Sequence, residues 1–463
     1  MATRALRISH VGLRGVVGNG LTATHILDFA SAFGTFLDIP VSNSPVVIGR
    51  DPRLSGLMLR EGVVSALLAT GHNVLDLGVV STPVIQHTIH RLGSPGGISI
   101  GASHNEASWN ALKFLGRDAA YLSTAQATEL LDIYHLRKFR FAPFNQLGAL
   151  ATDSTSIDFY LADLSAAFDF ERLRRFRVVV DCCNGTSSLL LQRLNERYGF
   201  SFILINAATD GRQFAHSPAT NARTVALQLA PLIDPLKADA GFLFDVDSDR
   251  VALATDLGES VSEELVFPLI ADHCLPQSDG RVVITNLSTT ALIEEIALRH
   301  GGRVLRAPVG RQAAIDALSA FRPGQVALAG EGTGAIMFAR FPYIYDGIVS
   351  MFTILELLAA RAQPLSAILA SFPRYCMLKG EVPLTTTRIP ELLMSLQEDF
   401  AGGAADMSDG LRIDWPQSPD QPQRWFHVRV AQTEPIVRVI CEQRGTPPHE
   451  LFDSLMDHVR SFS

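Results

Sequence analysis

The stretch GFLFDVDSDRVALA, residues 241–254, sets a loop rich in carboxylates between two apolar runs. The runs 241–244 and 251–254 have the apolar character of buried strands. In open α/β sheets, ligands bind beyond the carboxyl ends of the strands. The stretch therefore predicts a buried strand that ends in a functional loop, and it makes an α/β fold the first hypothesis.

The loop 245–250 carries three carboxylates at alternate positions, followed by Arg250. Carboxylates spaced in this way can converge on one hard cation, and the adjacent arginine can hold a phosphate or another anion. A solvated acidic turn is the alternative, but the apolar flanks argue against it. A calcium EF-hand does not fit, because Arg250 stands where glycine is needed and Asp256 where glutamate is needed. We therefore predict a divalent-metal site at Asp245, Asp247 and Asp249.

Other short β-branched runs alternate with helical patterns on both sides of this stretch, as is typical of βα units on a mostly parallel sheet. They form three groups of three, namely 46–49, 74–77 and 97–100, then 178–181, 202–205 and 241–244, then 282–285, 303–306 and 326–329. From about Pro373 onward the pattern changes. The runs 411–414, 425–430 and 436–440 alternate polar and apolar residues, which indicates an antiparallel sheet with one wet face.

The expected fold class is therefore α/β, with three similar α/β domains that have mixed sheets and a smaller C-terminal α+β domain with an antiparallel sheet. The expected domains are 1–150, 151–254, 255–372 and 373–463. A length of 463 residues is compatible with this number at roughly 150 residues per domain.

Composition narrows the class of protein further. Apolar residues make up 47% of the chain, charged residues 19%, and the mean hydropathy is +0.19, which indicates a core-rich globular protein. The 39 basic and 47 acidic residues give a net charge of −8, which argues against a nucleic-acid binder. A small anionic ligand remains compatible with this charge, because it needs only a local cluster of donors.

The sequence predicts a cytoplasmic protein without a membrane span. Residues 1–10 lack the apolar core of a secretory signal. The most apolar stretch, 347–360, contains Glu356 and is too short to cross a bilayer, so we expect a buried helix there. The five cysteines are scattered and form no C-x-x-C pair, which favours buried thiols in a reducing compartment.

A second loop with chemical potential follows the run 98–100. Ser103 stands there at a predicted strand end among small residues, where a serine is exposed enough to act as a nucleophile. The alternative is a turn serine that caps the next helix. A serine hydrolase is disfavoured, because its nucleophile elbow needs glycine where Asn105 stands.

Two later turns carry weaker signals of ligand binding. Glu331 and Thr333, set among glycines after the run 326–329, offer acceptors for hydroxyl groups, or they belong to a tight hairpin turn. Arg429 and Arg438 flank a turn with Thr433 and form a plausible phosphate cradle, or they are exposed strand arginines. Further basic groups near predicted strand ends are Arg14, Arg50 and Arg53.

Taken in order, these segments resemble the α-D-phosphohexomutase superfamily over essentially the whole chain. The motifs that carry the resemblance are Leu13-Arg14-Gly15, Gly49-Arg50-Asp51 with Arg53 and Ser55-Gly56, Ala102-Ser103-His104-Asn105, D-x-D-x-D-R at 245–250, Gly330-Glu331 with Thr333-Gly334, and R-x-x-x-T-E-P-x-x-R at 429–438. Any one of them can arise by chance, whereas the ordered set is highly specific. The family fold of three similar α/β domains and a smaller fourth one agrees with the expectation above.

The resemblance implies an intramolecular phosphotransferase that interconverts hexose 6-phosphate and hexose 1-phosphate through a bisphosphorylated sugar. It implies that Ser103 carries the phosphoryl group and that one Mg²⁺ binds between phosphorylated Ser103 and the three aspartates. Charge-stabilising and acid–base groups would be Lys113, Arg14 and Arg250. Substrate-binding residues would be Glu331, Thr333, Gly310, Arg311, Arg429, Thr433 and Arg438. The implied partner is a small-molecule hexose phosphate, bound by a monomer or homodimer.

The chain also departs from the family pattern. Ala431 stands where the family usually has serine, Gln432 where glycine or asparagine is common, and Ala335 where several branches carry histidine. The segments 20–22 and 408–414 are more similar to the archaeal type of phosphoglucosamine mutase, which makes glucosamine phosphate the preferred substrate. The alternatives are a phosphomannomutase/phosphoglucomutase and, in another class, a weakened paralogue that binds phosphosugars without turnover.

Overall fold

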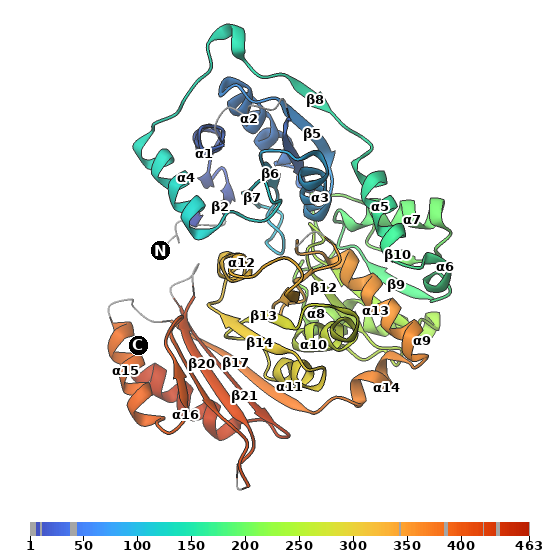
Figure 1. Ribbon diagram of the computed structural model, residues 1–463, viewed down its shortest axis with the longest axis vertical. Helices are drawn as coiled ribbons and strands as arrows, with labels where there is room; N and C mark the ends of the chain where they lie inside the picture. Colours follow the sequence, from blue (N-terminus) through green and yellow to red (C-terminus); the bar gives the residue numbers. More distant parts are fainter. Residues whose placement is uncertain are drawn as a thin grey trace.

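The computed structural model describes residues 6–9, 12–37, 44–341, 344–383, 388–419, 421–431 and 436–462. Four units, each built on its own sheet, follow one another along the chain (Figure 1). The first lies at the top of the view, the second at the right, the third in the centre, and the fourth at the lower left. The predicted fold class is confirmed: three α/β units have mixed sheets, and the C-terminal unit has an antiparallel sheet.

The first unit has an eight-stranded sheet in the order β1-β2-β7-β6-β4-β5-β8, with β3 paired to β2. The predicted runs form its parallel strands β6, β4 and β5, whereas β7, β2 and β1 extend it antiparallel. The elements are β1 (Leu6–Ser9), β2 (Gly12–Val17), β3 (Gly20–Leu21), α1 (Ala23–Phe36), β4 (Val46–Arg50), α2 (Gly56–Ala69), β5 (Val74–Val79), α3 (Thr82–Leu92), β6 (Gly97–Ile100), β7 (Trp109–Leu115), α4 (Thr124–Leu136), the 3₁₀ helix η1 (Phe144–Gln146) and β8 (Leu150–Thr152).

The second unit has a four-stranded sheet in the order β10-β9-β11-β12. Its first three strands are parallel, and β12 returns antiparallel to β11. The loop 245–250 is therefore the turn of a hairpin. The elements are α5 (Ser156–Ala167), α6 (Phe170–Leu173), β9 (Val178–Asp181), α7 (Ser187–Tyr198), β10 (Ile203–Ile205), α8 (Ala222–Gln228), α9 (Ala230–Leu236), β11 (Ala240–Phe244) and β12 (Val251–Ala254).

The third unit repeats this topology in the order β14-β13-β15-β16, again with an antiparallel last strand. Glu331 and Thr333 consequently lie in a hairpin turn like that of the aspartates. The elements are α10 (Glu263–Cys274), η2 (Leu275–Gln277), β13 (Val282–Asn286), α11 (Leu292–Arg299), β14 (Arg303–Ala307), α12 (Arg311–Ser319), β15 (Val326–Gly330), β16 (Ile336–Phe338), α13 (Gly347–Arg361) and α14 (Leu365–Ala370). The helix predicted for the most apolar stretch is α13, and it is buried as expected.

The fourth unit is an antiparallel sheet in the order β17-β21-β20-β19-β18. Two helices, α15 and α16, stand against this sheet (Figure 1). The elements are β17 (Tyr375–Pro383), α15 (Ile389–Asp399), β18 (Ala404–Asp406), β19 (Leu411–Trp415), β20 (Arg424–Val430), β21 (Ile436–Arg444) and α16 (His449–Ser461).

One apolar core runs through the first three units. It joins α3 of the first unit to the sheets of the second and third units and to α13, so these units pack as one body. The outer face of the first sheet and the fourth unit each have a separate core. All five cysteines are free thiols, and Cys274 and Cys376 are only partly buried. Among the described helices, none combines the length and the apolar character that crossing a bilayer requires.

The domain boundaries after residues 150, 254 and 372 stay predictions. Residue 150 lies within β8, which pairs with β5 in the first sheet, whereas residue 254 is the last residue of β12. Residue 372 lies between α14 and β17.

Candidate active site at the meeting of the units

The hairpin loop 245–250 is held by all three α/β units. Thr82, at the start of α3 in the first unit, donates its backbone N–H to Asp247 O at 3.1 Å. Gly347, at the start of α13 in the third unit, donates its backbone N–H to Ser248 O at 3.1 Å. Within the second unit, the hydroxyls of Thr186 and Ser248 are 3.0 Å apart. The loop thus lies near two helix N-termini, whose partial positive charge favours carboxylates.

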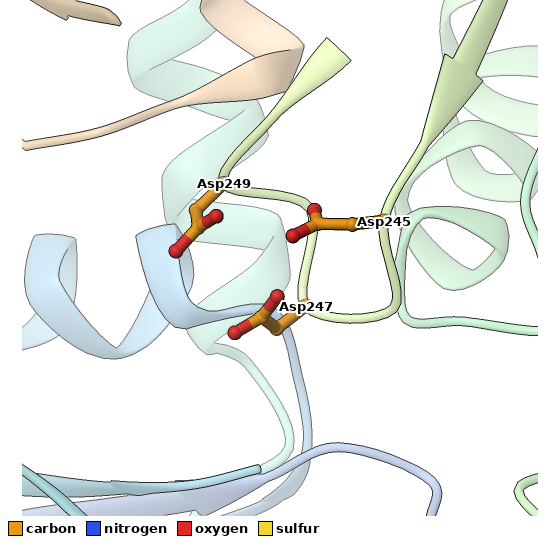
Figure 2. Close-up of side chains that lie close together, drawn as sticks. All are labelled: Asp245, Asp247 and Asp249. Carbon is orange, nitrogen blue, oxygen red and sulfur yellow. The ribbon is translucent and has the colours of Figure 1, made fainter. Parts of the chain in front are cut away.

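The carboxylates of Asp245, Asp247 and Asp249 are buried and have oxygens within 4.8 Å of one another. Figure 2 shows them turned toward a common point from the loop between two strands. Burial and the neighbouring carboxylates raise the pKa of Asp245 well above its ordinary value. Among the described residues, no donor hydrogen-bonds Asp247 Oδ1. A buried, incompletely satisfied set of hard oxygen donors fits a Mg²⁺ ion.

Cationic side chains from each α/β unit surround the aspartates. Lys113, on β7 of the first unit, forms a buried ion pair with Asp247. Arg311, at the start of α12 in the third unit, places Nη1 2.7 Å from Asp249 Oδ2. Burial would lower the pKa of Lys113, but the surrounding acidic groups, with Asp247 the strongest of them, together raise that pKa. These pairs compensate part of the negative charge that the loop buries.

Ser103 faces the aspartates from the loop after β6. Its Oγ donates a hydrogen bond of 2.6 Å to Asp245 Oδ2, and the residue is only 2% exposed. Its backbone φ is +49°, in the left-handed region that non-glycine residues rarely occupy. The structure thus brings Ser103 and the metal loop together, as the predicted roles require. Those roles themselves stay predictions.

Arg14 and Arg250 complete this end of the site, and His104 joins them. Arg14 Nη1 donates to Asn105 Oδ1 at 2.8 Å, and Arg250 donates its backbone N–H to Asp245 Oδ1 at 3.2 Å. Burial lowers the pKa of Arg14 to about 10. Burial and the charges of Arg250 and Arg14 lower the pKa of His104 to about 3, so its imidazole is neutral near pH 7. His104 belongs to the motif 102–105, but the sequence did not indicate a role for it.

Arg311 is more tightly engaged than a substrate-binding residue needs to be. Besides its ion pair with Asp249, its guanidinium lies 4.9 Å from the ring centres of both Tyr121 and Tyr345. It also donates a hydrogen bond to the Tyr121 hydroxyl. Gly310 precedes it with a φ of +136°, which a residue with a side chain rarely adopts. Tyr121 was not predicted from the sequence, because its contact with Arg311 joins two units and spans 190 residues.

Two neighbouring cavities form the open part of the site. One, of about 220 Å³, is lined by Arg14, Ser103, His104, Lys113, Arg250, Gly310, Arg311 and Glu331. The other, of about 550 Å³, is lined by Glu331, Thr333, Lys379, Arg429 and Arg438. Glu331 and Val309 line both cavities, so the two adjoin at the third unit. Lys379 was not predicted from the sequence. It is a single lysine on β17, a strand whose sequence does not alternate clearly between polar and apolar residues.

Glu331 and Thr333 lie at this junction in a tight hairpin turn. Thr333 Oγ1 donates to Glu331 Oε2 at 3.3 Å. Gly334 has a φ of +78°, and a Cβ atom there would lie 2.2 Å from Val251 O. The turn therefore packs directly against the end of the metal loop. The hairpin alternative and the ligand-binding alternative are both compatible with this geometry.

Arg429 and Arg438 are directly opposite each other on β20 and β21. Like charges at opposed positions of a sheet are destabilising without an anion between them. Burial and the charge of Arg438 lower the pKa of Arg429, whereas Asp409 opposes this effect. Arg438 also lies 3.4 Å from Glu381. Thr433, the third predicted group of this cradle, lies outside the described residues.

Comparison with known proteins identifies the family to which the chain belongs. Models of phosphoglucomutase/phosphomannomutase match three parts of the chain, with α/β/α domain I at residues 8–141, domain II at 158–258 and domain III at 263–375. A phosphoglucomutase/phosphomannomutase of Thermococcus kodakarensis is 30% identical over 94% of both chains. The chain belongs to the α-D-phosphohexomutase superfamily. It is therefore a phosphomutase, an isomerase that transfers phosphate within its substrate.

Other relatives differ in the substrate that their names give. A second protein of Thermococcus kodakarensis, named "Probable phosphoglucosamine mutase", is 29% identical over 93% of both chains. Among solved structures, a phosphoglucomutase/phosphomannomutase family protein from Burkholderia thailandensis has a TM-score of 0.80 and 25% identity, over 98% of this chain and 97% of that one. The N-acetylphosphoglucosamine mutase of Aspergillus fumigatus, solved with GlcNAc-6P and magnesium, shares the fold at a TM-score of 0.64 and 14% identity, over 98% of this chain and 95% of that one.

Behind the metal loop lies a buried histidine that no sequence pattern indicated. His216 Nε2 is 3.0 Å from Asp181 Oδ2, and its side chain is 5% exposed. Burial would lower the pKa of His216, but its hydrogen bonds to Asp181 and Cys183 outweigh this effect and raise the pKa to about 10. The folded protein therefore holds a proton on His216 that the unfolded chain releases above about pH 6.5.

This proton predicts how stability depends on pH. The stabilisation by charged His216 is fully present below about pH 6.5, and it is lost as pH rises toward about 10. We expect the His216→Gln variant to have a flatter alkaline decline in unfolding free energy than the wild type. Urea unfolding at a series of pH values measures the difference. Parallel declines for the two proteins would contradict the assignment.

Proposed function

We propose that this chain interconverts the 6-phosphate and the 1-phosphate of a hexose through a phosphoserine at Ser103. The observation that carries the proposal is the hydrogen bond of 2.6 Å from Ser103 Oγ to Asp245, inside a buried carboxylate cluster that Lys113 and Arg311 partly neutralise. This serine lies among carboxylates that can bind a cation and beside fixed positive charges, and this setting suits phosphoryl transfer better than acyl transfer.

Two half-reactions with balanced bonds describe the cycle. In the first, a sugar hydroxyl loses its proton and attacks phosphorus, the bond from phosphorus to Ser103 Oγ breaks, and a hexose bisphosphate forms. The sugar then turns over within the site. In the second, Ser103 Oγ attacks the other phosphate, whose bond to the sugar oxygen breaks, and a proton returns to that oxygen. His104 Nδ1 lies 3.5 Å from Ser103 Oγ, but a pKa of about 3 makes its imidazole a weak acceptor for this proton near pH 7. The acid–base groups of the proposal are therefore those that the resemblance implies, Lys113, Arg14 and Arg250.

Mg²⁺ would be held by Asp245, Asp247, Asp249 and the phosphate on Ser103. Bound there, the ion supplies positive charge that neutralises the transferring phosphoryl group. Lys113, Arg14 and Arg250 line the same cavity and contribute fixed positive charge to it. Arg311 lines this cavity as well, and its ion pair with Asp249 holds that carboxylate in place.

The distal phosphate, which does not react in a given half-reaction, would bind to Arg429 and Arg438. Their opposed placement supports this role, since an anion between them relieves the repulsion. Thr433 would join them. The hexose hydroxyls would meet Glu331 and Thr333 at the junction of the two cavities.

Glucosamine phosphate is the substrate that we prefer. Four carboxylates line the larger cavity. Glu263 and Glu264 pair with Lys379, and Glu381 pairs with Arg438, so Glu331 is the carboxylate that would favour an amino sugar over a neutral one. A phosphomannomutase/phosphoglucomutase remains the alternative within the class. Initial rates with a panel of purified hexose 6-phosphates distinguish the two, and turnover of none of them would favour a paralogue that binds phosphosugars without converting them.

The first prediction is that Ser103 carries phosphate in the active protein. Incubation with a hexose 1,6-bisphosphate should add one phosphate to the chain, located at Ser103 by peptide mass spectrometry. Ser103→Ala should lose nearly all mutase activity, because Ser103 supplies the one hydroxyl that hydrogen-bonds Asp245 among the residues that the structure describes. Full activity in this variant would contradict the phosphoserine mechanism.

The second prediction concerns the metal. Asp247→Asn removes one negative ligand, so Mg²⁺ affinity and turnover should both fall, while the fold survives because the loop lies beyond β11. Titration calorimetry with Mg²⁺ measures the affinity independently of activity. The matched control is Asp234→Asn, a change at an exposed aspartate that pairs only with Lys237 among described residues. Equal Mg²⁺ affinity in both variants would exclude Asp247 as a ligand.

The third prediction concerns the fourth unit. Arg429→Ala should mainly raise KM, because a contact to the distal phosphate is made equally in the ground and transition states. Turnover should change less, apart from some release of the bisphosphate. Arg424→Ala, at the other end of β20, is the control and should leave KM unchanged. Steady-state kinetics that show unaltered constants for Arg429→Ala would remove the fourth unit from the phosphate site.

A further inference from the structure

Arg53 lies beneath the Ser103 loop and faces neither cavity of the site. It follows β4 in the motif Gly49-Arg50-Asp51-Pro52-Arg53, and its side chain is 0% exposed. A fully buried guanidinium is costly unless each of its N–H groups is satisfied. Arg53 meets this requirement through hydrogen bonds to the loop that contains Ser103.

The five N–H donors of Arg53 have five acceptors. Nε donates to Asp51 Oδ2 at 2.8 Å. Nη2 donates to the carbonyls of Ser103 at 2.9 Å and Asn105 at 2.7 Å. Nη1 donates to the carbonyls of Trp109, at 3.1 Å, and Glu106. Four carbonyls of one loop therefore converge on a single rigid fork, which a lysine cannot reproduce.

The conformation of Ser103 explains why such a fork is needed. A φ of +49° is unfavourable for serine, and strained residues persist only where their surroundings over-determine them. Arg53 binds the carbonyl of Ser103 itself, and Asp51 accepts the backbone N–H of Ala102 at 3.2 Å. The Asp51–Arg53 pair thus grips the backbone on both sides of the strained residue.

Two residues of the second unit also contact Arg53. The ring centre of Phe214 lies 4.8 Å from the guanidinium carbon, and Gly211 forms a β-bridge with Arg53. A Cβ atom on Gly211 would lie 2.2 Å from Pro52 O, so only glycine allows this approach. The segment that contains Gly211 and Phe214 therefore fixes Arg53 relative to the metal loop of its own unit.

We propose that Arg53 is a positioning residue that holds Ser103 Oγ against Asp245 through both half-reactions, and that Phe214 holds Arg53. The inference rests on the proposed function. The sugar must turn over between the half-reactions, whereas Ser103 Oγ must stay at one place relative to the metal ligands. A displacement of about 1 Å in a reacting group costs on the order of 100-fold in rate.

The test uses the full-length protein, Mg²⁺ and a hexose phosphate that the wild type converts. Arg53→Ala and Arg53→Lys should each lower kcat by about 100-fold. KM should stay close to the wild-type value, because Arg53 does not line the cavities. Phosphorylation of Ser103 by a hexose 1,6-bisphosphate, followed by intact mass, should slow in parallel. Guanidinium ion at low millimolar concentration should restore part of kcat to Arg53→Ala, and methylammonium should not.

Two further variants keep the inference falsifiable. Phe214→Leu removes the stacking ring without removing a donor, so it should lower kcat less than Arg53→Lys and leave KM unchanged. Arg60→Lys is the matched control, because Arg60 pairs with Asp76 and Glu61 in the same unit away from the site, and its kcat should equal that of the wild type. Thermal unfolding identifies variants that fail to fold.

The outcomes separate the inference from the proposed function. A folded Arg53→Lys with wild-type kcat overturns the positioning role, and if the Arg53 variants do not fold, Phe214→Leu with wild-type kcat overturns it. Equal rises in KM and falls in kcat would also overturn it, since they indicate general loss of structure. An inactive wild type would overturn the proposed function, and the inference with it.

Discussion

The packing of the three α/β units has to accommodate three buried carboxylates on one short loop. Removing a carboxylate from water costs several kcal/mol unless opposite charge and hydrogen bonds replace the lost hydration. Here Lys113 comes from the first unit and Arg311 from the third, while the aspartates belong to the second. The ion pairs of the loop therefore need residues from all three α/β units. The apolar core also extends across these units, so the ion pairs and the core both stabilise the same packing of the three units.

The repeated topology of the second and third units explains where the functional groups stand. In both sheets, the last strand returns antiparallel, and its hairpin turn lies beyond the carboxyl end of a buried strand. One turn carries the aspartates and the other carries Glu331, and the two turns touch where Gly334 meets Val251. The turn that carries the aspartates and the turn that carries Glu331 are therefore fixed to each other by backbone contact rather than by mobile side chains.

Sequence patterns predicted the parts of this structure that depend on local burial. The parallel strands β4, β9 and β13 are continuous β-branched runs, and the loop of aspartates follows such a run, so both were evident. The return strand β7 was missed, because its polar residue Lys113 is buried only through an ion pair with Asp247, 134 residues away. The hydrogen bonds of the Arg53 guanidinium were not predicted either, because its sequence motif does not indicate which carbonyls it binds. The resemblance to a family predicted that Ser103 and Asp245 share one site. Composition and spacing alone did not predict this, because the two residues are 142 positions apart in the sequence.

The two ends of the site differ in how strongly they constrain a ligand. At the serine end, Ser103 and the three aspartates are buried, and Lys113 and Arg311 pair with two of the aspartates. On the proposed function, this arrangement narrows where the reacting phosphorus can lie. At the other end, Arg429 and Arg438 face each other across two strands and offer charge without a fixed geometry. A hexose that must present either of its phosphates to Ser103 needs such an arrangement, because direction-dependent contacts that favour one orientation would hinder the other. The hydroxyl partners proposed between the ends, Glu331 and Thr333, are correspondingly few, and on this proposal the site specifies the reaction more firmly than it specifies the sugar.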